Sequence, residues 1–198
     1  IRPTMLIEDA SGCVVSVTSP DQITIHPLPR PRFTASQTEI CLGQTVRFTN
    51  TSTSERPITG LEWDFGDGNT STANNPVHTF LDTGTFVVNL RLSTVDGCVD
   101  TMAVPLEIQV NAPPPAIFDM NNATACVPFP VAFSDSSTGA FPIVNWEWDF
   151  GDGNTDNGQV ITPHLYDSAG VYTATLTVTD TRGCTGQAGR IITANALP

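Results

Sequence analysis

The sequence contains no lysine, and all eight of its basic residues are arginines. Twenty acidic residues outnumber them, so the formal net charge is −12. Binding to the phosphate backbone of a nucleic acid depends on clustered basic side chains. The arginines are scattered instead, at Arg2, Arg30, Arg32, Arg47, Arg56, Arg91, Arg182 and Arg190. The charge therefore argues against a nucleic-acid partner, and its simplest role is to keep the chain soluble.

A long apolar run is missing as well, and so is any helical spacing of apolar residues. No stretch approaches the roughly 18 consecutive apolar residues that a membrane-spanning helix needs. Residues 1–10 also lack the basic start and the continuous apolar core of a secretion signal. We therefore expect a segment of a longer protein, with no membrane span inside it.

None of the five cysteines lies in a Cys-x-x-Cys pair, which is a common element of zinc sites. They are widely and regularly spaced instead, at Cys13, Cys41, Cys98, Cys126 and Cys184. Such spacing favours disulfides, which persist in oxidising compartments. We predict that the chain is extracellular, either secreted or at the cell surface.

An internal repeat organises the chain. The octet Trp-Asp-Phe-Gly-Asp-Gly-Asn-Thr begins at Trp63 and recurs 85 residues later at Trp148. The cysteines follow nearly the same period, and proline-rich segments at 27–31 and 113–115 mark the boundaries. The sequence thus predicts two complete units, 29–112 and 113–198, after the last strands of a truncated unit, 1–28. Proline runs favour stiff, extended joints between such units.

Short β-branched and aromatic runs separated by turn residues predict an all-β fold. In the first complete unit they occur at 45–50, 60–65, 77–80, 85–93 and 102–110, with a weaker one at 33–36. In the second unit, residues 173–179 alternate threonine with apolar residues, as a half-buried strand does. About seven strands in each unit predict tandem immunoglobulin-like β-sandwiches.

The repeated octet, and the strand motifs that follow it, resemble the PKD (polycystic kidney disease) repeat. The resemblance covers both complete units, and it implies an immunoglobulin-like sandwich. The cysteine-containing type resembles spacer arrays in large bacterial surface proteins, although PKD repeats also accompany secreted hydrolases. The motif residues that carry the resemblance are Trp63, Asp64, Gly66, Asp67 and Gly68, and Trp148, Asp149, Gly151, Asp152 and Gly153.

The four aspartates of the motif, Asp64, Asp67, Asp149 and Asp152, are also the candidates for a calcium site, because carboxylates are hard oxygen ligands. The favoured interpretation is a turn, in which the glycines adopt positive φ and the aspartates accept hydrogen bonds from nearby amides. No cofactor is expected. His78 and His164 occupy equivalent positions without a neighbouring nucleophile, so both are interpreted as buried, hydrogen-bonded side chains rather than catalytic ones.

The aromatic residues are mostly assigned to the core. Trp63 and Trp148 are predicted to anchor the two sandwiches, and alternation directs Trp146 to the same face as Trp148. Tyr166 aligns with the core position Phe80. Phe141 remains as the best candidate for an exposed aromatic that could stack on a sugar.

Two disulfide schemes are compatible with the spacing. The simpler one pairs Cys41 with Cys98 and Cys126 with Cys184 inside the two units. The other joins Cys41 to Cys184 across the units, and in either scheme Cys13 is left unpaired. In an idealised sandwich the two cysteine positions of one unit lie at opposite ends, which counts against the simpler scheme. Thr101 and Ser168 follow an Asp-Ser/Thr-apolar pattern and are candidate O-glycosylation sites.

The sequence predicts a non-catalytic spacer segment of a large extracellular adhesin or filament protein, and no residue is proposed as catalytic. Its expected partners are neighbouring repeats of the same chain. Two alternatives remain open. One is an accessory module of a secreted hydrolase that binds a polysaccharide or a protein. The other is a subunit that self-associates into a fibre.

Overall fold

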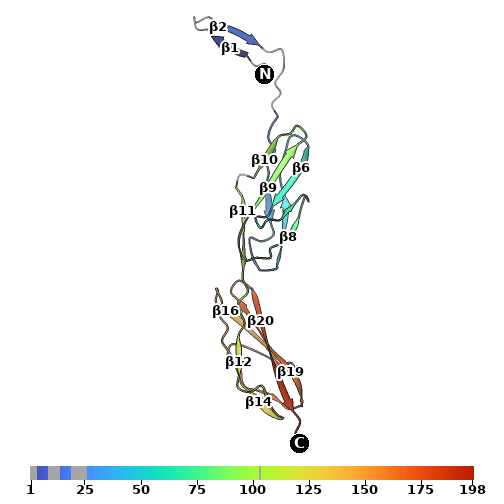
Figure 1. The fold of residues 1–198 in the computed structure, drawn as a ribbon, viewed down its shortest axis with the longest axis vertical. Helices are drawn as coiled ribbons and strands as arrows, with labels where there is room; N and C mark the ends of the chain where they lie inside the picture. The colour runs from blue at the N-terminus through green and yellow to red at the C-terminus, as the bar shows by residue number, and fades with distance from the viewer. Residues whose placement is uncertain (1–3, 9–13, 19–25, 103) are drawn as a thin grey trace. The chain divides into compact units, whose positions relative to one another are not determined.

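The computed structural model describes residues 4–8, 14–18, 26–102 and 104–198. These residues form twenty β-strands and contain no helix, as the composition predicts (Figure 1). The chain divides into two compact units. One takes in residues 1–34, 48–76 and 89–105, and the other residues 35–47, 77–88 and 106–198.

The first two strands form a hairpin. Strand β1 (Thr4–Glu8) pairs antiparallel with β2 (Val14–Thr18), so that Thr4 lies opposite Thr18. Both strands belong to the predicted tail of a truncated unit, 1–28. Cys13 falls outside the described residues.

The first complete repeat contributes strands β3 to β11. Their bounds are β3 (Phe33–Ala35), β4 (Glu39–Cys41), β5 (Thr45–Asn50), β6 (Ile58–Asp64), β7 (Thr70–Ser71), β8 (Val77–Thr79), β9 (Gly84–Thr94), β10 (Val99–Thr101) and β11 (Leu106–Asn111). One sheet has the order β4-β11-β9-β6-β7, with β10 also paired to β9, and the other has the order β3-β5-β8. Strand β9 pairs antiparallel with its neighbours, whereas β4 and β11 are parallel.

The second complete repeat has the same plan. Its strands are β12 (Phe118–Met120), β13 (Thr124–Cys126), β14 (Phe129–Val131), β15 (Phe133–Asp135), β16 (Ile143–Asp149), β17 (Thr155–Asn157), β18 (His164–Tyr166), β19 (Gly170–Asp180) and β20 (Thr185–Asn195). The five-stranded sheet has the order β13-β20-β19-β16-β17, with β13 and β20 parallel. Facing strands pair as β12-β15 and β14-β18, and β14 and β15 together replace β5.

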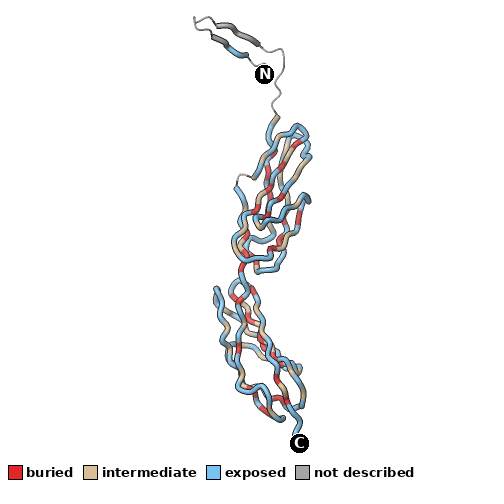
Figure 2. Tube along the Cα trace, viewed as in Figure 1, coloured by how far each residue is buried: buried red, intermediate tan, exposed pale blue. Residues whose placement is uncertain are grey.

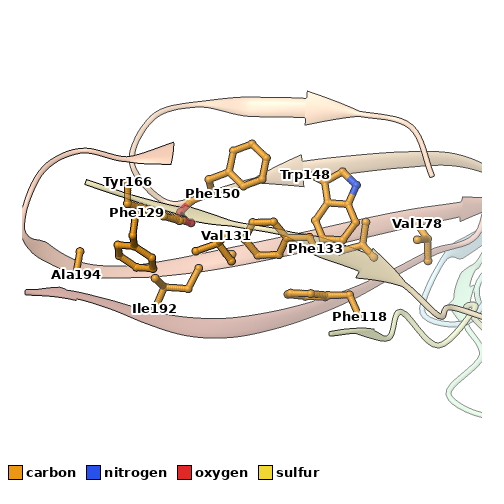
Figure 3. Close-up of a cluster of buried hydrophobic side chains, with 12 residues drawn as sticks. Phe118, Phe129, Val131, Phe133, Trp148, Phe150, Tyr166, Val178, Ile192 and Ala194 are labelled. Carbon is orange, nitrogen blue, oxygen red and sulfur yellow. Dashed lines mark hydrogen bonds between the residues drawn. The ribbon is translucent and has the colours of Figure 1, made fainter. Parts of the chain in front are cut away.

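A tryptophan on the larger sheet of each repeat, the one with more strands, packs against two phenylalanines from other strands. Trp148 is 1% exposed, and its ring meets Phe118 and Phe133 at centroid distances of 5.2 and 5.6 Å (Figure 3). In the first repeat the equivalent Trp63 packs on Phe33 and Phe48. Each ring buries a large apolar area, which makes these clusters the main apolar anchors of the two sandwiches.

The two-residue alternation predicted for the second repeat is present in β19. Ala174, Leu176 and Val178 are buried, and the threonines between them are exposed or half-buried. Figure 2 shows the same alternation of buried and exposed positions along the strands of the second repeat. Alternation of this kind gives a sheet one apolar face for the core.

The strands that the sequence predicted in the first repeat have counterparts in the structure, with ends shifted by at most two residues. The exception is the run 102–110, whose strand begins only at Leu106. Strands β4, β7 and β10, of two or three residues each, were not predicted. Such short runs carry little alternation, although the equally short β3 and β8 were recognised from their aromatic and β-branched residues. Among the described residues there is no helix that could cross a membrane.

Replacing Trp148 with phenylalanine tests the anchor role. The change removes buried ring atoms and the hydrogen bond from Nε1 to the carbonyl oxygen of Gly158, which is 3.1 Å long. We expect the free energy of unfolding of the second repeat to fall by about 2–4 kcal/mol. Urea unfolding followed by circular dichroism measures this.

The matched control is Val171→Ala, because Val171 also lies in the five-stranded sheet but is 71% exposed. Its effect is expected to stay within about 0.5 kcal/mol. Equal losses in the two variants would contradict the anchor role of Trp148.

Candidate functional site

The two Trp-Asp-Phe-Gly-Asp-Gly motifs form the same turn. Asp64 Oδ1 accepts a hydrogen bond from the amide of Gly66 at 2.9 Å, and Asp149 Oδ1 accepts one from Gly151 at 2.8 Å. The next aspartate of each turn accepts from the amide two residues on, at 3.0 Å in both repeats. These carboxylates orient the turn backbone, as the turn interpretation requires.

The glycines of these turns have a conformational reason. Gly66, Gly68, Gly151 and Gly153 have φ between +78° and +95°. Gly151 also lies against the backbone of Thr173, which a Cβ atom would overlap. A side chain at Gly151 is therefore disfavoured twice, by its φ and by lack of space.

The calcium interpretation receives no support from the arrangement of ligands. Among the residues that the structure describes, no group of three or more His, Cys, Asp or Glu side chains could hold a metal ion. Asp67 and Asp152 already accept hydrogen bonds from the side-chain amides of Asn69 and Asn154, both at 3.1 Å. Calcium binding at these turns stays a prediction.

His164 is half-buried in the second repeat. Its Nε2 lies 2.7 Å from Asp152 Oδ2, and its ring stacks on Phe150 with a centroid distance of 3.9 Å. Burial raises the pKa of Asp152, but hydrogen bonds from Asn154 and His164 outweigh this effect, so the pKa lies below its usual range. The predicted hydrogen bond is present, but His164 is half-buried rather than fully buried.

Tyr166 confirms its predicted core position. It is 1% exposed, and its hydroxyl donates a hydrogen bond to the carbonyl oxygen of Phe150 at 2.9 Å. Burial raises the pKa of the hydroxyl, and the nearby Asp152 charge adds to the rise. Tyr166 is therefore not available as a sugar-stacking surface.

Trp146 and Phe141 border a hollow of about 550 Å³ in the second repeat. Trp146 is half-buried, as predicted, and its Nε1 donates to Asp135 Oδ2 at 2.8 Å. Phe141 was expected to be an exposed aromatic, but it is only half-exposed. The guanidinium of Arg182 lies 4.6 Å from its ring centroid and covers one face. The hollow thus offers no open row of aromatic rings.

The disulfide in the structure joins Cys41 to Cys184, with Cα atoms 5.4 Å apart. This is the pairing across repeats, so the simpler scheme of 41–98 and 126–184 is wrong. Cys98 and Cys126, which were also proposed as disulfide residues, are free thiols here. The bond lies within the second compact unit, which includes both cysteines.

Strand geometry explains why a repeat does not bridge its own cysteines. Cys126 lies opposite Asn195 on β20, whose neighbour Ala194 faces Gly170 at the start of β19. Cys184 follows the end of β19 at Asp180. Eleven residues of extended strand separate these two ends, a distance of roughly 34 Å. A disulfide requires Cα atoms within about 7 Å.

Several contacts surround the bond. Glu39, two residues before Cys41, accepts hydrogen bonds from Arg182 and from Asn111 Nδ2. Gly186, two residues after Cys184, lies so close to the carbonyl oxygen of Pro114 that a Cβ atom would overlap it. The disulfide therefore lies next to an ion pair and close to the proline joint.

Three contacts of the second compact unit were not found from the sequence, namely Glu39 with Arg182, Arg182 with Phe141, and Asp135 with Trp146. The first two join residues far apart in the chain, the third joins residues eleven positions apart, and none belongs to a repeated motif. The candidate glycosylation sites Thr101 and Ser168 are both exposed, and their modification stays a prediction.

Comparison with known proteins assigns both repeats to one family. The family model described as PKD domain matches residues 28–110 and 111–193. A curated relative, the pre-pro-metalloprotease PrtV of Vibrio cholerae, is 30% identical over 143 residues, which are 71% of this chain and 15% of that protein. The chain thus matches only a small part of that relative's length.

Two solved structures are similar to single repeats. The PKD1 domain of the Vibrio cholerae metalloprotease PrtV is 30% identical and covers 42% of this chain and 98% of its own, with a TM-score of 0.37. The PKD1 domain of Vibrio anguillarum Epp is 23% identical and covers 43% of this chain and 99% of its own, with a TM-score of 0.38.

Acid titration tests the role of Asp135. Burial raises its pKa, but hydrogen bonds from Ser137, Trp146 and Gln159 outweigh burial and lower it. A carboxylate with a lowered folded-state pKa stabilises the fold above its unfolded pKa of about 3.9, and this contribution is lost as pH falls through the folded value. We expect Asp135→Asn to cost about 1 kcal/mol at pH 7 and progressively less below pH 4.

Urea unfolding at a series of pH values from 7 to 2.5 measures this difference. Asp119→Asn, which changes an exposed carboxylate in β12, is the control and is expected to follow the wild type at every pH. A loss for Asp135→Asn that stayed constant down to pH 2.5 would exclude a charge effect.

Proposed function

This chain belongs to the PKD domain family, and we propose that it is a non-catalytic spacer segment of a large extracellular surface protein. The observation that carries the proposal is the disulfide between Cys41 and Cys184. It links two consecutive repeats covalently through side chains, in addition to the peptide backbone. An independent binding module needs no such link. A spacer benefits from such a link, because the link restricts motion between consecutive repeats.

The bond also stabilises the repeats against unfolding. It closes a loop with a sequence separation of 143 residues. In the chain-entropy model a loop of this length stabilises the folded state by roughly 5 kcal/mol. The same bond supports an extracellular location, since structural disulfides persist in oxidising compartments.

The contacts around the bond fit the same role. Arg182 donates to Glu39 and covers the ring of Phe141, so one side chain connects three segments of the second compact unit. The close approach of Gly186 to Pro114 adds steric restriction next to the proline joint. Charge, packing and a covalent bond thus restrict the same region.

A second candidate function is an accessory module of a secreted enzyme. The relative that favours it is the pre-pro-metalloprotease PrtV, in which the matching segment is a small part of the chain. A polysaccharide-binding version of this role is less favoured, because Tyr166 is buried and Arg182 covers Phe141. Retention of the chain on insoluble chitin or cellulose would support the polysaccharide-binding version of this role.

Interspin distances test whether the bond stiffens the segment. Spin labels on non-natural residues replacing the exposed Asp82 and Asp167, one in each repeat and both in the second compact unit, avoid the cysteines. We expect one narrow distance distribution for the oxidised chain and a much broader one for the Cys41→Ser, Cys184→Ser variant. Cys98→Ser with Cys126→Ser is the matched control and is expected to keep the narrow distribution. A broad distribution in the oxidised chain would refute a rigid spacer.

Stretching single molecules from their ends tests the mechanical consequence. The disulfide prevents extension of the residues between Cys41 and Cys184, a separation of 143. At about 3.5 Å per residue, the double serine variant is expected to release roughly 500 Å more contour length than the oxidised chain. Equal contour lengths would show that the bond bears no load.

A further inference from the structure

The free cysteines Cys98 and Cys126 occupy the same structural positions as the bonded pair. We propose that each forms a disulfide with an adjacent repeat, Cys98 with the Cys41-type residue of a preceding repeat and Cys126 with the Cys184-type residue of a following one. One such bond would then cross every joint of the array. The inference rests on the proposed spacer role, because it requires further repeats on either side.

Cys126 has the strand position of Cys41. In the first repeat β4 pairs parallel with β11 and places Cys41 opposite Asn111. In the second repeat β13 pairs parallel with β20 and places Cys126 opposite Asn195. The residue after each cysteine donates its amide to that asparagine, Leu42 to Asn111 at 2.9 Å and Val127 to Asn195 at 3.0 Å. Cys126 is also exposed, so its thiol is accessible to a partner.

Cys98 has the turn position of Cys184. Thr94 donates its amide to the carbonyl oxygen of Cys98 at 2.9 Å, and Asp180 donates to that of Cys184 at 3.0 Å. The glycine before each cysteine has nearly the same positive φ, 78° at Gly97 and 80° at Gly183. The two hairpins therefore hold their cysteines in the same backbone geometry.

A second observation indicates where the partner of Cys98 would lie. The sulfur of Cys98 is 4.0 Å from the carbonyl oxygen of His26. His26 precedes Phe33 by seven residues, as Asn111 precedes Phe118, so His26 occupies the position of Asn111. Asn111 is the strand partner of the bonded Cys41. A preceding repeat that paired its own β4-type strand beside His26 would bring its cysteine next to Cys98.

The chemistry is a thiol–disulfide exchange with a small disulfide oxidant, such as oxidised glutathione. The two cysteine thiols lose two electrons and two protons as their sulfur–sulfur bond forms. The oxidant's sulfur–sulfur bond breaks, and it leaves as two thiols that carry those electrons and protons. The oxidising compartment proposed above supplies such an oxidant.

A three-repeat chain tests the proposal. Asn195 and Ala196 match Asn111 and Ala112, so residues 113–198 can be joined directly after Ala196 to reproduce the natural joint. The exposed Thr185 of the appended repeat is replaced with serine, so that the peptide around its Cys184 has a distinct mass. After refolding with oxidised and reduced glutathione, peptide mass mapping without reduction is expected to find two bonds. One is Cys41–Cys184, and the other links Cys126 to Cys184 of the appended repeat.

The Cys41–Cys184 bond is the internal control, because it reports that the same molecule has folded and been oxidised. The proposal is overturned if the map contains the Cys41–Cys184 bond but shows Cys126 either free or bonded to any cysteine other than that of the appended hairpin. In the three-repeat chain, Cys126→Ser should free only the cysteine of the appended hairpin, whereas Cys98→Ser should leave both bonds intact.

The mirror experiment tests Cys98. Residues 29–111 placed directly before Pro27, in place of residues 1–26, supply a preceding repeat with a Cys41-type residue. Mapping is expected to find that residue bonded to Cys98, and a free Cys98 would contradict the proposal. These maps are independent of the interspin distances, so a bonded but flexible array would refute the spacer role and leave the bonding pattern standing.

Discussion

The constraint on which the other features depend is the length of the long central strand in each repeat. Strand β19 has eleven residues and separates the parallel edge strand that carries Cys126 from the hairpin that carries Cys184. Because a disulfide has a short reach, the two cysteine positions of a repeat cannot meet each other. The bond from Cys41 to Cys184 accordingly joins residues of two different repeats. Under the proposed bonding pattern, a repeat with this topology would carry one half of a covalent link at either end.

The sequence predicted the fold because its signals are local and occur twice. The Trp-Asp-Phe-Gly-Asp-Gly turns need glycine at positive φ and aspartate close to backbone amides. These requirements fix the residue types, so the turns can be recognised from the sequence. The alternation in β19 follows from a sheet with one buried face. Strand β4 escaped recognition because its three residues depend on parallel pairing with β11, a contact that no local pattern encodes.

The candidate site was only partly predictable, since the cysteine spacing is compatible with two schemes. The period makes Cys41 equivalent to Cys126 and Cys98 to Cys184, but equivalence alone does not say which two meet. The answer needed the register of β13 beside β20, which places Cys126 far from Cys184 along the sheet. Phe141 shows the same limit. Its sequence context indicates an exposed ring, and only the structure places the guanidinium of Arg182 over it.

The charged residues near the disulfide differ between the two repeats, whereas the cysteine positions do not. Glu39 pairs with Arg182 beside the disulfide. In the first repeat the position of Arg182 is taken by Asp96, which pairs with Arg56 at 2.5 Å instead, and in the second the position of Glu39 is taken by Thr124. A neighbouring repeat would therefore meet an already paired carboxylate at Asp96 and an uncharged side chain at Thr124. The cysteine positions recur in both repeats, whereas the ion pair does not. Under the proposed bonding pattern, the covalent bond is therefore common to all joints, and the salt bridge belongs to a single joint.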